Sequence, residues 1–101
     1  MLKTQKGWKI GVRKYCKEEN VDQTEELMIV YDVETAKYML CKISELAESS
    51  SKYGDIDTFN WTRRSHRADD QMSIQYTFEG KGIKWVMIFA DAVEFITVEA
   101  G

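Results

Sequence analysis

The sequence of 101 residues contains no proline, two cysteines and one histidine. Two cysteines do not make the disulfide framework on which small secreted domains depend. We therefore expect Cys16 and Cys41 to be free thiols in a reducing cytoplasm. The longest apolar stretches span residues 27–31 and 85–90, far short of the ~20 residues that cross a membrane. No apolar segment follows the basic N-terminus either, so we expect a cytoplasmic protein without a membrane partner.

Motifs for catalysis or for metal binding are also missing. A nucleophile needs a base and an orienting group close by. The only histidine, His66, is flanked by Ser65 and Arg67, and neighbouring residues on a strand point to opposite sides. Cys16, Cys41 and His66 lack the close-paired spacing of a zinc site, and either cysteine could meet His66 only through the fold. We expect no catalytic residues, no metal and no cofactor.

The composition that is present is typical of one globular domain. Apolar residues make up 44% of the chain and charged residues 31%, a balance found in folded rather than disordered proteins. Three Trp, five Tyr and four Phe indicate a packed core. The length is that of one domain, so we expect residues 1–101 to form a single α+β domain.

Alternation of apolar and polar residues predicts most of the strands, and residues 27–31 form a continuous apolar run of strand length. In the strand at residues 83–90, Trp85, Met87 and Phe89 share one face. Loops or turns are expected at residues 18–26, at 66–70 and at the glycine-rich 79–82. The strands are expected at residues 7–16, 27–31, 58–62, 72–78, 83–90 and 93–98.

One amphipathic helix is predicted between the second and third strands. Asp32 is its expected N-cap, and Gly54 is expected to end it. The order is then β-β-α-β-β-β, with an antiparallel sheet of five to six strands and the helix packed on one face. The predicted apolar stripe has helical spacing and consists of Ala36, Met39, Leu40, Ile43, Leu46, Ala47 and Ser50.

Charge is divided into two blocks near the N-terminus. Residues 1–17 carry six basic side chains and no acid, and residues 18–34 carry seven acids and no Lys or Arg. The acidic block could attract a basic protein partner and repel nucleic acid. Alternatively, the two blocks neutralise each other across a hairpin, each cross-strand pair contributing ~0.2–1 kcal/mol. The candidate partner-binding residues in the acidic loop are Glu18, Glu19, Asp22, Glu25 and Glu26.

A basic segment with aromatic character is the second candidate site. Arginine matches phosphate bidentately, and a tryptophan can stack on a base. The alternative is a charged turn or edge strand that resists aggregation. Sheets that bind RNA expose aromatic residues on central strands, whereas the alternation here is expected to direct the aromatics toward the core. The candidate anion-binding residues are Trp61, Arg63, Arg64, His66 and Arg67.

The build of the chain, short, slightly acidic and without a catalytic set, resembles that of small inhibitors encoded by bacteriophages, such as anti-CRISPR proteins. This resemblance implies a non-enzymatic protein-binding module that occludes a surface of its partner, with the acidic loop as the contact. The alternative is a protein that binds a small anionic ligand, a nucleotide or nucleic acid through residues 63–67; an enzyme ranks third. A homodimer through edge pairing of residues 93–98 is compatible with either function.

Overall fold

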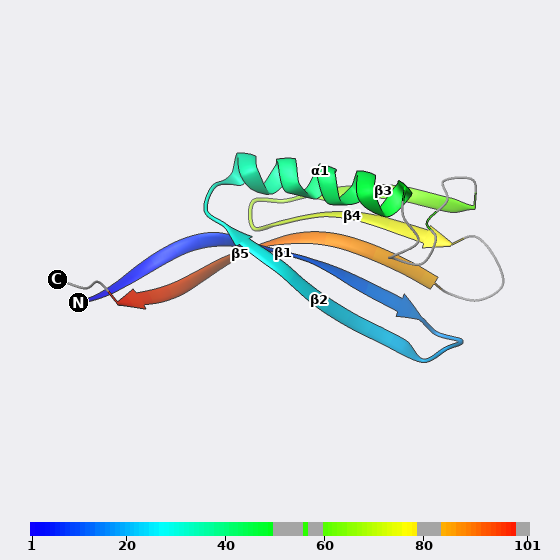
Figure 1. The fold of residues 1–101 in the computed structure, drawn as a ribbon, viewed down its shortest axis with the longest axis horizontal. Helices are drawn as coiled ribbons and strands as arrows, with labels where there is room; N and C mark the ends of the chain where they lie inside the picture. Colours follow the sequence, from blue (N-terminus) through cyan, green and yellow to red (C-terminus); the bar gives the residue numbers. More distant parts are fainter. Residues whose placement is uncertain (50–55, 57–59, 79–83, 99–101) are drawn as a thin grey trace.

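A computed structural model describes residues 1–49, 56, 60–78 and 84–98. Its strands form one open antiparallel sheet in the order β2-β1-β5-β4-β3, and a single helix crosses one face of this sheet (Figure 1). The predicted α+β class, the element order and the antiparallel sheet are confirmed. The elements are β1 (Leu2–Cys16), β2 (Val21–Val30), α1 (Val33–Ser49), β3 (Trp61–Arg67), β4 (Gln71–Phe78) and β5 (Lys84–Val98).

The first hairpin differs from the prediction. β2 begins at Val21, so the loop expected over residues 18–26 is a turn of residues 17–20. Asn20 closes this turn in the left-handed region, at a φ of 54°, which asparagine tolerates better than most residues. The predicted loop was wrong because this polar segment pairs with β1 along residues 21–26, and Asp22 and Glu26 form ion pairs with Arg13 and Lys9 of that strand.

Two further boundaries were placed wrongly. β3 continues to Arg67, so the turn expected from residue 66 is confined to residues 68–70. The strand expected at 93–98 is not separate, because β5 runs without a break and pairs with β1 along its whole length. The hairpin turn at 79–82 and the helix stop at Gly54 lie outside the described residues.

The core lies between α1 and the face of the sheet that the helix covers. Ala36, Leu40, Ile43 and Ala47 are all buried on the helix, as the stripe predicts. Leu46 is not part of this face, because Ser44 lies nearer the centre of the buried stripe. At the first turn, the Thr35 amide donates to the Asp32 carboxylate at 2.9 Å, which confirms the N-cap. The sheet contributes Ile10, Val12, Met72, Ile74, Tyr76, Val86, Ile88 and Ala90.

The aromatic side chains of β5 point to the other face of the sheet. The expectation that they face a core was wrong, because Val86, Ile88 and Ala90 occupy the helix side and side chains alternate along a strand. On the helix-free face, Trp85 stacks against Tyr15 of β1 with ring centroids 5.4 Å apart. On this face Phe89 is buried, whereas Trp85 and Tyr15 are half-buried, and no helix among the described residues covers them.

β1 and β5 extend beyond their neighbours as a two-stranded ribbon (Figure 1). The register pairs Leu2 with Val98 and Gly7 with Val93, whereas β2 reaches only Trp8 on β1. The molecule is accordingly elongated, with extents of 57 × 27 × 23 Å. Across the described residues, no helix is long and apolar enough to span a membrane.

Candidate functional site

Two of the predicted acidic contacts are occupied by partners on β1. The Arg13 guanidinium donates to both carboxylate oxygens of Asp22, at 3.1 and 3.0 Å. This hydrogen bonding lowers the pKa of Asp22 below its ordinary value. Lys9 forms an ion pair with Glu26 at 3.2 Å. The neutralisation of the two charge blocks across the hairpin is therefore present for these pairs.

The other acids of the set lie in the turn, at Glu18 and Glu19, and on β2, at Glu25. Glu18 lies in the turn, where the Cys16 thiol donates to its carboxylate at 3.8 Å. Glu25 and Glu26 are neighbours on β2, so their side chains point to opposite faces of the sheet. Glu19 and Glu25 are exposed and have no polar partner among the described residues. Their contact with a basic partner stays a prediction, at a hairpin less negative than the sequence suggests.

The basic segment forms an edge strand rather than a turn. β3 pairs only with β4 in the described part of the chain, and all of its residues after Trp61 are exposed. The register pairs Arg63 with the core residue Tyr76. Alternation therefore directs Arg63, Ser65 and Arg67 to the helix side of the sheet and places Arg64 and His66 on the helix-free side. The predicted anion-binding residues are split between two faces.

The hydrogen bond of Ala68 shows which backbone groups of β3 point away from β4. The Ala68 amide donates to the carbonyl of Gln71 at 2.7 Å, across the hairpin to β4. In an antiparallel pair, successive residues direct their N–H and C=O groups alternately toward the partner and away from it. It follows that the backbone groups of Arg63, Ser65 and Arg67 point outward from the sheet. The same three residues direct their side chains toward α1.

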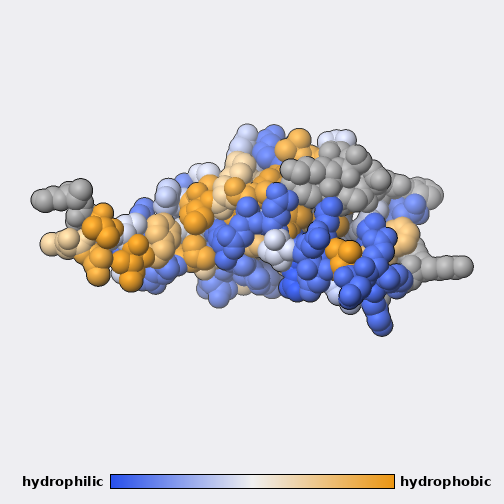
Figure 2. All heavy atoms as spheres, turned by 60° about the horizontal axis from the view of Figure 1, so that its bottom comes forward, coloured by the Kyte–Doolittle hydropathy of each residue, from blue (hydrophilic) through white to orange (hydrophobic). Residues whose placement is uncertain are grey.

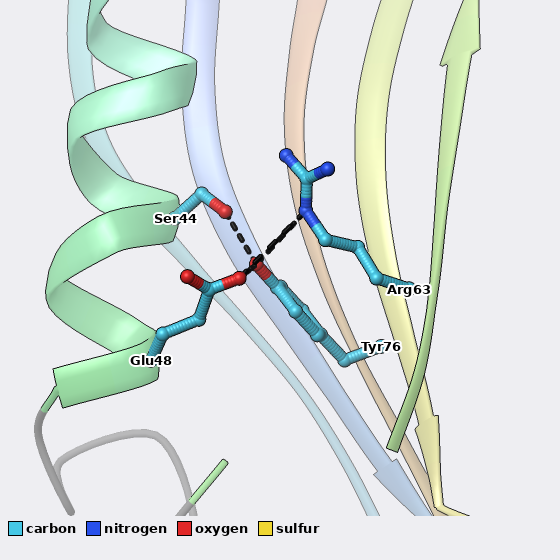
Figure 3. Close-up of polar contacts among 4 residues, drawn as sticks. All are labelled: Ser44, Glu48, Arg63 and Tyr76. Atoms are coloured by element: carbon cyan, nitrogen blue, oxygen red, sulfur yellow. Dashed lines mark hydrogen bonds and ion pairs between the residues drawn. The ribbon is translucent and has the colours of Figure 1, made fainter. Parts of the chain in front are cut away.

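Arg63 is held by a polar cluster that joins β3, β4 and α1 (Figure 3). Tyr76 is fully buried; its hydroxyl donates to Glu48 and also bonds to the Ser44 hydroxyl, both at 2.5 Å. The Arg63 guanidinium donates to the Tyr76 hydroxyl at 3.3 Å and lies 3.7 Å from the Glu48 carboxylate. The cluster fixes the position of one arginine of the predicted site.

Burial raises the pKa of Tyr76 above its ordinary value, and the hydrogen bond to Glu48 acts in the same direction. A carboxylate can accept only while the phenol keeps its proton, so this bond favours the neutral tyrosine. Bonds from Ser44 and Arg63 oppose the shift. The cluster is thus built around a protonated tyrosine.

A groove of about 220 Å³ lies between α1 and β3. Its floor is apolar, with Leu40 and Ile74, and its rim carries basic and polar groups from both elements. Lys37 and Cys41 belong to this lining and were not predicted from the sequence; only their position one turn apart on the flank of the helical stripe could have indicated them. The lining residues are Lys37, Leu40, Cys41, Arg63, Ser65, His66, Arg67, Met72, Ser73 and Ile74.

Trp61 does not belong to an exposed base-stacking surface. It is half-buried against the core, its ring contacts Phe78 at a centroid distance of 5.5 Å, and Lys84 lies over it at 5.8 Å. On the helix-free face, Trp85 already has Tyr15 and Arg13 against it, with the guanidinium 5.6 Å from its ring. The aromatic surface open to a nucleobase is therefore limited at Trp61 and at Trp85.

The cysteines and the histidine form no hydrogen bond with one another among the described residues. Cys16 is buried and Cys41 exposed, and both are free thiols. Cys41 and His66 are both among the residues that line the groove, but alternation directs the His66 side chain to the helix-free side of β3. Neither side chain has a polar partner in the part of the chain that the structure describes. Within those same residues, no group of three His, Cys, Asp or Glu side chains could hold a metal ion.

The comparisons with known proteins identify no relative. No family model matches the sequence, no curated protein is similar to it, and no solved structure matches the fold. The functional interpretation therefore rests on the geometry of the edge strand, the groove and the ribbon.

Proposed function

We propose that this protein is a non-enzymatic protein-binding module that adds an acidic, extended segment of its partner as a strand beside β3. The observation that carries this proposal is the basic edge of β3, which is open among the described residues and lies next to the groove between α1 and β3. Strand addition to an exposed edge is a general mode of peptide recognition, in which backbone hydrogen bonds supply affinity and side-chain pockets supply specificity.

The backbone of β3 supports this mode of binding. Arg63, Ser65 and Arg67 direct their N–H and C=O groups outward, where an added strand would pair with them. The residues opposite these three on the added strand would point to the helix side of the sheet, toward the groove and its Lys37 and Cys41. The other residues of the added strand would lie beside Arg64 and His66.

The charge of the edge supports an acidic partner. Arg64 and Arg67 are exposed and have no ion pair among the described residues, whereas Lys37 is paired with Glu34 at 3.2 Å. A carboxylate beside either arginine would form a charge-assisted bond. The opposite edge, β2, is acidic and has its own partners on β1. Binding alone is sufficient for an inhibitor that occludes a surface of its partner, which is the role that the build of the chain suggests.

The proposal is tested by titrating the full-length protein with a labelled synthetic peptide of alternating Glu and Val, and in parallel with a peptide of alternating Lys and Val. Fluorescence anisotropy should show binding of the glutamate peptide that weakens as salt is raised, and little binding of the lysine peptide. Equal affinity for both peptides would contradict the proposal. A nucleotide or inorganic phosphate that competes as well as the peptide would favour a small-anion site instead.

Variants separate the charge of the edge from its backbone. Arg67→Glu should weaken the glutamate peptide by roughly tenfold, because it replaces an attraction by a repulsion. Lys42→Glu makes the same charge change on α1 outside the groove lining and should leave binding nearly unchanged. Ser65→Pro removes an outward N–H without touching the β4 ladder, a position where proline is tolerated, and should weaken binding without lowering stability. Aggregation of the arginine variant with peptide affinity unchanged would assign the charges to protection of the edge.

A further inference from the structure

The ribbon formed by residues 2–7 of β1 and 93–98 of β5 has an unusual construction. Both of its outer edges are open in the described residues, because β2 reaches only Trp8 and β4 pairs with β5 only as far as Asp91. A two-stranded ribbon by itself is marginally stable in water. β1 begins and β5 ends at its tip (Figure 1).

The ribbon also carries the most exposed aliphatic side chains of the sheet. Leu2 is 70%, Ile96 69% and Val98 76% exposed. The register pairs Leu2 with Val98 and Thr4 with Ile96, so all three aliphatic residues share the face on which α1 lies. Figure 2, in which the side of the molecule away from α1 comes forward, also shows hydrophobic atoms at the ribbon end. An apolar surface gathered at one end of a small protein marks an interaction site.

On the outer edge of β5, Ile96 and Val98 also direct their backbone groups away from β1. The Ala92 amide donates to the Asp70 carbonyl at 2.8 Å, on the β4 side of the strand. Alternation then directs the N–H and C=O groups of Glu94, Ile96 and Val98 to that side, beyond the end of β4. The outward backbone groups and the exposed apolar side chains therefore lie on the same short stretch of β5.

We propose that a second copy of this chain occupies this edge, by antiparallel pairing of residues 94–98 of the two copies about a two-fold axis at Ile96. In this register Ile96 faces its own counterpart, and Glu94 of each copy faces Val98 of the other. Two-stranded ribbons then join into four strands, and the side chains of Leu2, Ile96 and Val98 from both copies form one apolar cluster.

Charge selects the second copy and the β5 edge. Residues 93–98 contain one charged side chain, Glu94, which the two-fold register keeps away from its counterpart. The corresponding stretch of β1 carries two basic side chains, Lys3 and Lys6, so pairing of that edge with a second copy would bring four charges of one sign to the contact, against two for β5. The edges β2 and β3 are likewise protected from pairing with themselves, since one is acidic and the other basic. The symmetric contact is closed, so it ends at a dimer.

The oligomeric state tests this inference. Sedimentation equilibrium of the full chain over a concentration series should fit a monomer–dimer equilibrium with a dimer of twice 11.8 kDa. Ile96→Lys and Glu94→Pro should each weaken dimerisation by roughly tenfold or more, the first by charge at the symmetry axis and the second by loss of an edge N–H. Leu46→Lys, on an equally exposed residue of α1 (62%), should dimerise like the unmodified protein.

Circular dichroism first establishes that each variant is folded. A monomer at every concentration would overturn the inference, and so would a dimer that survives both ribbon variants. Assembly that continues past two copies as concentration rises would show a heterologous contact and would also contradict it. Because the peptide site at β3 lies at the opposite edge of the sheet from β2 and outside the ribbon, the two proposals succeed or fail separately.

Discussion

Replacing Tyr76 by phenylalanine is the most informative test of how α1 is attached to the edge of the sheet. The substitution keeps the buried ring and removes only the hydroxyl. That hydroxyl donates to Glu48, bonds to Ser44 and accepts from Arg63. Ser44 is only 3% exposed, so its own hydroxyl loses its partner in a place that water does not readily reach.

The size of the effect follows from these contacts. A buried polar group left without a partner costs ~1–3 kcal/mol, and a net hydrogen bond contributes ~1 kcal/mol. We expect Tyr76→Phe to lower the free energy of unfolding by about 2 kcal/mol at neutral pH, which lowers Tm by about 8–16 °C for a chain of this size. Tyr38→Phe is the matched control, because its ring lies on the exposed side of α1 (60%) and should change stability little.

The pH dependence gives an independent sign. The folded state raises the pKa of Tyr76, so the stabilisation is fully present below the ordinary tyrosine pKa of about 10 and is lost as pH rises through the folded value. Urea unfolding followed by circular dichroism should therefore show the difference between the protein and Tyr76→Phe shrinking near pH 11. Equal stability at neutral pH, or a difference that stays constant with pH, would refute this account of the cluster.

Two further substitutions test the backbone and the helix start. Gly11→Ala should lower the free energy of unfolding by about 1–3 kcal/mol, because the added Cβ would lie 2.6 Å from the Phe89 ring and 2.6 Å from a carbonyl of β2. Gly7→Ala should lower it clearly less, because the nearest atoms to its Cβ would be 3.1–3.3 Å away. The opposite ranking of the two unfolding midpoints would contradict the packing argument. Asp32→Asn should keep the N-cap but remove the stabilisation that the Asp32 carboxylate loses as pH falls through its lowered pKa. The free energy of unfolding of this variant should therefore fall less steeply at acid pH than that of the unmodified protein. An equally steep fall would show that the bonds from Thr35 do not favour the charged carboxylate.

Much of the fold could be predicted from the spacing of apolar residues along the sequence alone. The alternation at Trp8, Ile10 and Val12 and the helical stripe from Ala36 to Ala47 mark the core because each has one apolar face. β5 could not be oriented in this way, since Trp85, Met87 and Phe89 on one face and the aliphatic residues on the other are both apolar. Which face of β5 is covered depends on where the helix packs. The helix packs against the assembled sheet, so the sequence of one strand does not determine that face.

The candidate sites were harder to predict because they depend on contacts between distant segments. Glu26 and Asp22 were identified as acidic, but their pairing with Lys9 and Arg13 depends on the register of β1 against β2. The groove combines a helix with a strand that follows it by more than ten residues. The ribbon forms between the two ends of the chain, where polar residues 3–6 join a strand because residues 94–97 pair with them.

The measurement that tests the proposed function most directly is amide hydrogen exchange of the full chain by NMR, with and without the peptide of alternating Glu and Val. An added strand should slow exchange at the outward amides of Arg63, Ser65 and Arg67, while Arg64 and His66, which already face β4, should change little. Protection in this alternating pattern would establish strand addition at β3. Binding of the peptide without it, or with protection only at the β1–β2 hairpin, would contradict the account.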